Sequence, residues 1–325
     1  MRKWLPGLLI FSLTFTIGAL ATRSPKKELM PIPMPPIETG SGPTPAVTEI
    51  DEPVDPHEPH VLDEFADTDT LSYRGYQIRR HHKTVNFDFL PNRSQVEVSY
   101  ALLTKRNKTV AAFDGVYHPM GNETQFGLFK LLRNGSRQLV VEQNCWRAGA
   151  HWIVDFSRGF RLIYDSSTWN VGREELSVID LDGDGQDEII QTSNAFYEFM
   201  DIMAMGAIPQ PRIIFKYDAR AGRYVPANRS FPEYIRKSMT TDLELIQQEQ
   251  AKLPDAVLPV VLDYIYLGQE KKGWKYFERA CGYCDKQELR QRIKAILRKD
   301  PVYRYTYRRE SLPYRGSVGS AVPSR

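Results

Sequence analysis

Residues 176–190 have the sequence LSVIDLDGDGQDEII, and this stretch decides the fold. Short apolar and β-branched runs at 176–179 and 189–190 enclose an acidic centre. Such runs favour strands. Between them a carboxylate occupies every second position from 180 to 184, and a glycine follows. The pattern therefore predicts an acidic turn that joins two β-strands.

The acidic turn predicts a calcium site. Like charges this close together are unfavourable unless a cation lies among them, and Ca²⁺ accepts several oxygens in a flexible shell. Gly185 allows the sharp turn that brings the oxygens together. The expected ligands are the backbone carbonyl of Gln186 and the side chains of Asp180, Asp182, Asp184 and Glu188. An Asp/Gly-rich turn without an ion is the alternative.

The flanks and spacing of the turn do not fit an EF-hand. An EF-hand needs helices on both sides and a bidentate glutamate at loop position twelve, which is Gln191. The string Asp-Leu-Asp-Gly-Asp-Gly-x-x-Glu-Ile at 180–189 instead resembles the calcium hairpin of FG-GAP and VCBS repeats, found in integrin-type β-propellers. The resemblance covers about residues 176–200. It implies a calcium-binding β protein whose ion stiffens a loop.

The rest of the chain predicts a mainly β protein, with blade-like sheets or a β-sandwich, followed by a small C-terminal α-helical subdomain. Alternating runs separated by turn residues recur through 70–226, the expected β domain. The hydrophobic period becomes helical over 231–300. A capping box at 241–244, Pro254 and Asp285 indicate helix starts. Residues 301–325, rich in tyrosine and arginine, are expected to be a basic tail.

The N-terminus indicates export. Arg2 and Lys3 precede an apolar run, and Ala-Leu-Ala at 19–21 is a typical cleavage site, so residues 1–21 are expected to be a signal peptide. The run is short for a membrane span, and no transmembrane helix is expected in the mature chain. Residues 22–65 are proline-rich and acidic, which predicts a poorly ordered linker. We expect a periplasmic, outer-surface or secreted protein.

A second motif supplies an alternative function. The string Cys281-Gly-Tyr-Cys284 resembles the active-site motif of periplasmic thioredoxin-like disulfide isomerases. A thioredoxin fold places a buried strand before the first cysteine, but residues 273–280 are amphipathic and charged, as in a helix. A thiol–disulfide oxidoreductase is therefore the alternative, and a local structural disulfide at a helix–helix turn is favoured.

Other features favour a binding or scaffolding protein over an enzyme. The chain contains no P-loop, G-x-S-x-G, H-E-x-x-H or G-x-G-x-x-G motif. His118 and His151 are expected in the core or at the surface. An apolar, methionine-rich patch at 196–205 is expected in the core, with a partner groove as the alternative.

The charge distribution suggests the kind of partner. The net charge is +3, yet residues 265–325 contain 15 Lys and Arg against 6 Asp and Glu. After export, an envelope protein or an anionic envelope surface is a better partner for this basic end than nucleic acid. A plainly solvated helical face with a floppy tail is the default expectation.

Overall fold

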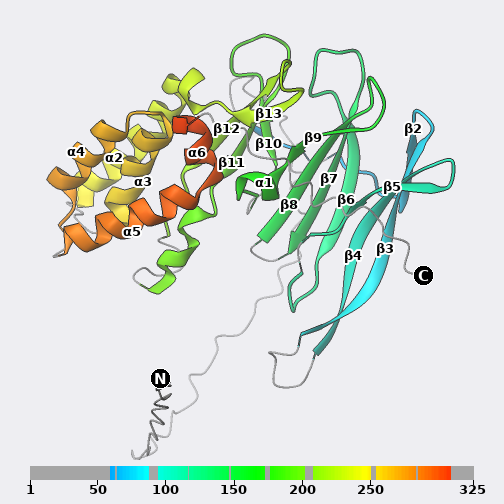
Figure 1. Ribbon diagram of the computed structural model, residues 1–325, viewed down its shortest axis with the longest axis horizontal. Coiled ribbons are helices and arrows are strands. Elements are labelled where there is room, and N and C mark those ends of the chain that lie inside the picture. Colours follow the sequence, from blue (N-terminus) through cyan, green and yellow to red (C-terminus); the bar gives the residue numbers. More distant parts are fainter. Residues whose placement is uncertain are drawn as a thin grey trace, which may run out of the picture. The chain divides into compact units, whose positions relative to one another are not determined.

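The computed structural model describes residues 59–62, 64–87, 94–115, 117–145, 148–172, 176–201, 208–249, 254–282 and 285–308. These residues form three antiparallel sheets followed by C-terminal helices, shown in Figure 1. The prediction of a mainly β chain with a small helical end is therefore confirmed.

Two of the sheets are meanders whose strands follow one another along the chain, and the third adds the distant strand β1 to such a meander. The first contains β2 (Thr70–Tyr73), β3 (Tyr76–Phe87), β4 (Ser94–Lys105) and β5 (Lys108–Phe113). The second contains β6 (Glu123–Phe129), β7 (Gln138–Cys145), β8 (Ala148–Asp155) and β9 (Arg161–Asp165). The third contains β10 (Ser177–Ile179), β11 (Glu188–Thr192), β12 (Arg212–Asp218) and β13 (Arg223–Pro226), with β1 (His60–Val61) at its edge. Four-stranded meanders are the unit of propeller blades, of which a propeller needs at least four. The described residues contain three.

β1 lies within the range predicted to be a linker. His60 pairs with Val178 and Val61 with Ser177. Leu62 is buried, and its N–H donates to the carbonyl of Leu176 at 3.1 Å. The end of the predicted linker is therefore a strand of the third sheet. The predicted signal peptide and residues 22–58 lie outside the described residues.

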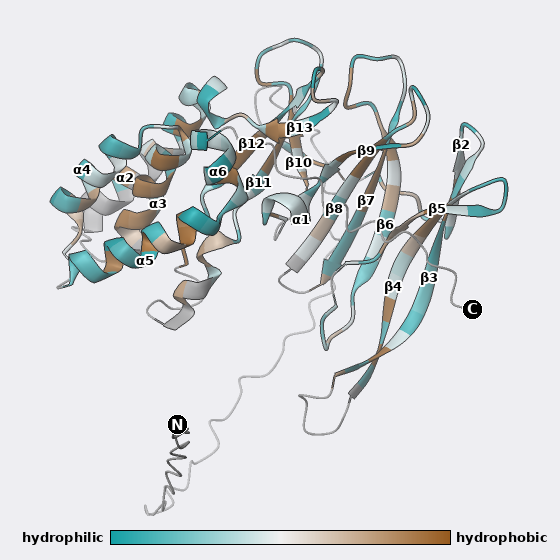
Figure 2. Ribbon diagram, in the orientation of Figure 1, coloured by the Kyte–Doolittle hydropathy of each residue, from teal (hydrophilic) through white to brown (hydrophobic). Residues whose placement is uncertain are grey.

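Successive side chains of a strand point to opposite faces of its sheet. The β6–β9 sheet therefore contributes side chains to a different hydrophobic cluster on each face. Val141 and Trp152 belong to the cluster shared with β2–β5, and the rings of Trp152 and Phe113 are 5.7 Å apart. Val140 and Ile153 belong to the cluster shared with β10–β13. Figure 2 shows hydrophobic segments along β7, β8 and β9, whereas β3 is mostly hydrophilic.

Among the described residues, five α-helices follow the third sheet. They are α2 (Pro232–Glu249), α3 (Pro254–Tyr266), α4 (Glu270–Ala280), α5 (Lys286–Lys299) and α6 (Pro301–Arg308). Leu262 of α3 and Leu297 of α5 share one buried cluster with Phe215 of β12. The core of the sheets thus continues into the helices.

Two of the three predicted helix starts are confirmed. α3 begins at Pro254, and the Asp285 carboxylate caps α5 by accepting the Glu288 N–H at 2.8 Å. The capping box at 241–244 is wrong, because it lies inside α2, which begins at Pro232.

The predicted tail begins with a helix. Residues 301–308 form α6, whose first position suits proline because no N–H is required there. The buried Asp300 carboxylate precedes it and accepts the Tyr303 N–H at 3.1 Å. Val302 is also buried, so packing against the core stabilises α6 in addition to the N-terminal proline and the Asp300 carboxylate. Residues 309–325 lie outside the described residues.

The apolar patch predicted at 196–205 packs in the core in part, because two of its phenylalanines are buried whereas Tyr197 is 42% exposed. It forms the 3₁₀ helix η1 (Ala195–Asp201), in which Phe196 and Phe199 are fully buried and their rings stack at 5.8 Å. The core prediction is confirmed for these two residues, and residues 202–207 lie outside the description. Among the described helices, none combines the length and apolar character needed to cross a membrane.

Candidate metal centre

The acidic turn connects β10 to β11 as predicted. Ile179 pairs with Glu188, so residues 180–187 form the connection. Gly183 and Gly185 have φ values of +70° and +77°, a region that glycine enters without steric cost. The Asp180 carboxylate accepts the N–H groups of Asp184 at 3.1 Å and Gly185 at 2.8 Å. The turn is thus held by its own first aspartate.

Three of the predicted ligands converge. One carboxylate oxygen each from Asp180, Asp182 and Glu188 lies within 4.8 Å of the others. Glu188 is only 1% exposed, whereas the Asp182 side chain is 43% exposed. Burial raises the pKa of Glu188 above its ordinary value, although the Leu181 N–H donates to its Oε2 at 2.8 Å. Three converging carboxylate oxygens fit a hard cation such as Ca²⁺.

The other two predicted ligands lie beside this group. The Asp184 carboxylate accepts the Gln186 N–H at 2.9 Å, and the Gln186 side-chain amide lies 3.4 Å from Asp184 Oδ2. Asp184 is outside the converging set of three. The Gln186 carbonyl stays a predicted ligand.

A lysine that the sequence analysis missed lies among the carboxylates. Lys216 Nζ is 2.5 Å from Asp182 Oδ2, 2.9 Å from Asp184 Oδ2 and 3.1 Å from Glu188 Oε1. Burial alone would lower the pKa of Lys216, but hydrogen bonds to these three carboxylates raise it above its ordinary value. The hydrogen bond from Lys216 in turn lowers the pKa of Asp184. The ammonium therefore partly neutralises the loop.

Strand register explains the position of Lys216. Ile189 of β11 pairs with Phe215 of β12 in the antiparallel ladder. One step further along the ladder, Glu188 and Lys216 come opposite each other. The available signal was a charged residue inside the apolar run 213–217. Its partner could be identified only after the two strands had been paired.

The turn also joins two sheets. The Asp187 N–H donates to the carbonyl of Leu131, between β6 and β7, at 3.0 Å. Arg133 from the same connection donates to the Asp184 carbonyl at 3.3 Å. On the other side, the Tyr224 hydroxyl of β13 donates to the Asp187 carbonyl at 3.1 Å. Stiffening this turn would therefore stiffen the junction between the second and third sheets.

The first cysteine of the Cys281–Cys284 motif lies at the end of a helix. Cys281 follows α4 directly, and its side chain is 2% exposed within the main cluster. Cys284 lies outside the described residues. Catalytic thiols occupy partly exposed, electropositive positions, so the burial of Cys281 does not favour the oxidoreductase alternative.

His151 lies in the core, one of the two locations expected for it. It is fully buried, and its Nε2 is 2.9 Å from Oε1 of the buried Glu142. His118 accepts the Met120 N–H through Nδ1 at 3.1 Å.

Comparisons with protein-family models, curated proteins and solved structures find no match to this chain.

Proposed function

We propose that this chain is an exported calcium-binding protein with a binding or scaffolding role in the cell envelope. The ion would lie in the turn between β10 and β11. The convergence of carboxylate oxygens from Asp180, Asp182 and Glu188 is the observation that carries the proposal. Asp184 and the Gln186 carbonyl are the further proposed ligands.

The surroundings of the turn support a structural role for the ion. The turn bonds to the β6–β7 connection and to β13. A cation that holds the carboxylates in place would therefore stabilise contacts between sheets. The buried Glu188 is part of this arrangement, because a buried carboxylate needs a compensating charge.

The proposed location and partner depend on the sequence. The N-terminal pattern supports export, and calcium sites of moderate affinity are filled outside the cytosol. The basic C-terminal end supports an envelope protein or an anionic envelope surface as partner.

Calcium titration tests the proposal. Chelator-treated protein should release or absorb heat when Ca²⁺ is added, and its melting temperature should rise with the ion concentration. At about one hundred times the Kd, one bound ion adds roughly 2.7 kcal/mol to the free energy of unfolding. Asp182→Ala should remove both responses, because it deletes one converging oxygen.

Asp187→Asn is a matched control within the same turn. Asp187 is outside the converging set, so this variant should keep the calcium response. A wild-type protein that gives no heat, and whose melting curve is identical with Ca²⁺ and with chelator, would refute the proposal.

A further inference from the structure

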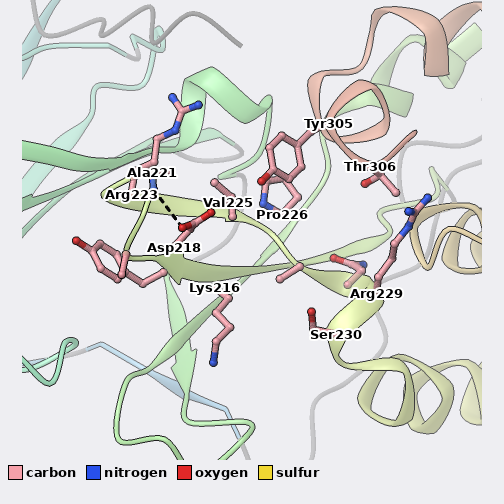
Figure 3. Close-up of a pocket in the computed structure, with 14 residues that line it drawn as sticks. Lys216, Asp218, Ala221, Arg223, Val225, Pro226, Arg229, Ser230, Tyr305 and Thr306 are labelled. Atoms are coloured by element: carbon pink, nitrogen blue, oxygen red, sulfur yellow. Dashed lines mark hydrogen bonds between the residues drawn. The ribbon is translucent and has the colours of Figure 1, made fainter. Parts of the chain in front are cut away.

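Lys216 belongs to two features of the surface at once. Its ammonium contacts three loop carboxylates, and the same residue lines a pocket of about 730 Å³. The pocket lies along β12 and β13 and is completed by residues 227–230 and by α6. Figure 3 shows Arg223 and Arg229 toward opposite ends of it, with Tyr305 between them.

The wall of the pocket favours an anion. Its basic residues are Lys216, Arg223 and Arg229, and its acidic residue is Asp218. The Asp218 carboxylate accepts the N–H groups of Arg220 at 2.8 Å and Ala221 at 3.1 Å, which directs it to its own turn. Two arginines can bind carboxylate, phosphate or sulfate groups through several donors.

In this structure, the Lys216 ammonium lies against the acidic turn. Figure 3 shows its side chain leaving β12 on the side opposite Tyr305. Three carboxylates hold the ammonium there by charge-assisted hydrogen bonds. This arrangement reduces the contribution of Lys216 to the potential of the pocket.

A divalent cation and the ammonium compete for the same oxygens. Asp182 and Glu188 are both Lys216 partners and members of the converging set. A cation and an ammonium group that contact the same carboxylates repel each other strongly where they are shielded from bulk water. The flexible four-carbon stem of lysine lets its ammonium move away when the carboxylates bind another cation.

We infer that Lys216 couples the two sites: cation binding at the loop displaces its ammonium, and the pocket then binds an anionic ligand more tightly. This coupling rests on the proposed calcium site. It must be reciprocal, so the anion tightens calcium binding by the same factor. A factor of about ten is typical of such couplings.

Two titrations test the coupling. The first measures Ca²⁺ affinity by calorimetry for wild type, Lys216→Met and Lys216→Arg. Lys216→Met removes the competing charge and should bind Ca²⁺ about tenfold more tightly, whereas Lys216→Arg keeps the charge and should stay near wild type. Circular dichroism checks that each variant is folded.

The second titration follows p-toluenesulfonate by ligand-observed NMR, with Ca²⁺ or with chelator. This sulfonate combines an anionic group with an aromatic ring, which suits a wall of arginine and tyrosine. Wild type should bind it about tenfold more tightly with Ca²⁺, and Lys216→Met should lose most of that difference. Arg223→Gln should weaken sulfonate binding without changing Ca²⁺ affinity.

The outcomes separate the two proposals. If Ca²⁺ binds wild type but Lys216→Met leaves its affinity unchanged, the coupling is refuted and the calcium site stands. The same conclusion follows if sulfonate affinity is equal with and without Ca²⁺. If neither wild type nor Lys216→Met binds Ca²⁺, the calcium site and the coupling both fail.

Discussion

At the scale of single residues, three buried carboxylates depend on specific neighbouring side chains. Glu188, Glu142 and Asp300 are each at most 2% exposed. Each has a specific partner: Lys216 for Glu188, His151 for Glu142 and the Tyr266 hydroxyl for Asp300. Burying a charge without such a partner is strongly unfavourable. These positions should therefore tolerate substitution poorly.

Asp300→Asn should remove a pH-dependent part of the stability. Burial raises the pKa of Asp300 from 3.8 to about 6, so the folded protein binds this proton more tightly than the unfolded chain. The stabilisation is fully present below the unfolded pKa and is lost as the pH rises through the folded pKa. Its size is about 3 kcal/mol. Urea unfolding of both proteins between about pH 4 and pH 8 measures it.

The matched control is Asp285→Asn, at the exposed N-cap of α5. It removes an exposed carboxylate from the neighbouring helix and controls for the loss of an acidic side chain in this part of the chain. A difference between wild type and Asp300→Asn that does not vary with pH would contradict the expectation.

At the scale of elements, close contacts between neighbours constrain the sequence. Gly273 on α4 faces α3, where an added Cβ would lie 2.8 Å from the carbonyl oxygen of Val261. The absence of a side chain therefore lets the two helices approach closely. Helix propensity does not explain a glycine here, because Gly273 lies inside a helix and alanine is the better helix former. The lack of space for a side chain does explain it.

Gly273→Ala should destabilise the protein by about 1–3 kcal/mol, since the new methyl group must push the helices apart. Helix propensity alone predicts the opposite sign, a gain of about 1 kcal/mol. Urea denaturation distinguishes the two. Ala295→Gly, on the exposed side of α5, is the reference for propensity and should cost about 1 kcal/mol. A Gly273→Ala protein as stable as wild type would disprove the steric argument.

The elements predicted best from sequence are those with strong local signals. The connection between β4 and β5 is the two-residue turn Arg106–Asn107, with left-handed φ values of 50° and 61°, a region that asparagine enters more readily than most residues. The α5 start at Asp285 depends on a capping residue that can be recognised locally. In contrast, β1 has only two residues and no measurable period, so nothing distinguished it from the proline-rich linker.

The candidate site could be predicted only in part, for a similar reason. The three converging carboxylates follow from one local string, and the turn itself determines their positions. Lys216 is contributed by another strand, and its position depends on the register between β11 and β12. Long-range pairing is set by tertiary packing, which no local pattern reveals.

At the scale of the whole molecule, one hydrophobic cluster extends from the second sheet through the third sheet into the helices. The helical end therefore shares its core with the sheets. Because both sets of elements lose packing partners when either one unfolds, we expect a single cooperative unfolding transition for the described part of the chain.

Leu297→Ala tests this cooperativity from the helical side. Leu297 is 1% exposed and belongs to the shared cluster. Its truncation should cost about 2–5 kcal/mol. The transitions measured by far-ultraviolet circular dichroism and by fluorescence of tryptophans in the sheets and helices should shift together. Helical signal lost well before that of Trp152 in the second sheet would show instead that the helices unfold as a separate unit.

The pairing of β1 with β10 has a mechanical consequence. A pull applied through Pro59 acts first on the two residue pairs that fasten β1 to β10. β10 leads directly into the acidic turn. Because only two residue pairs hold β1, tension on the N-terminal side should detach this strand before the longer strand pairs separate. A calcium ion bound in the acidic turn would stabilise β10, the strand with which β1 pairs. The force needed to detach β1 should therefore rise with the calcium concentration.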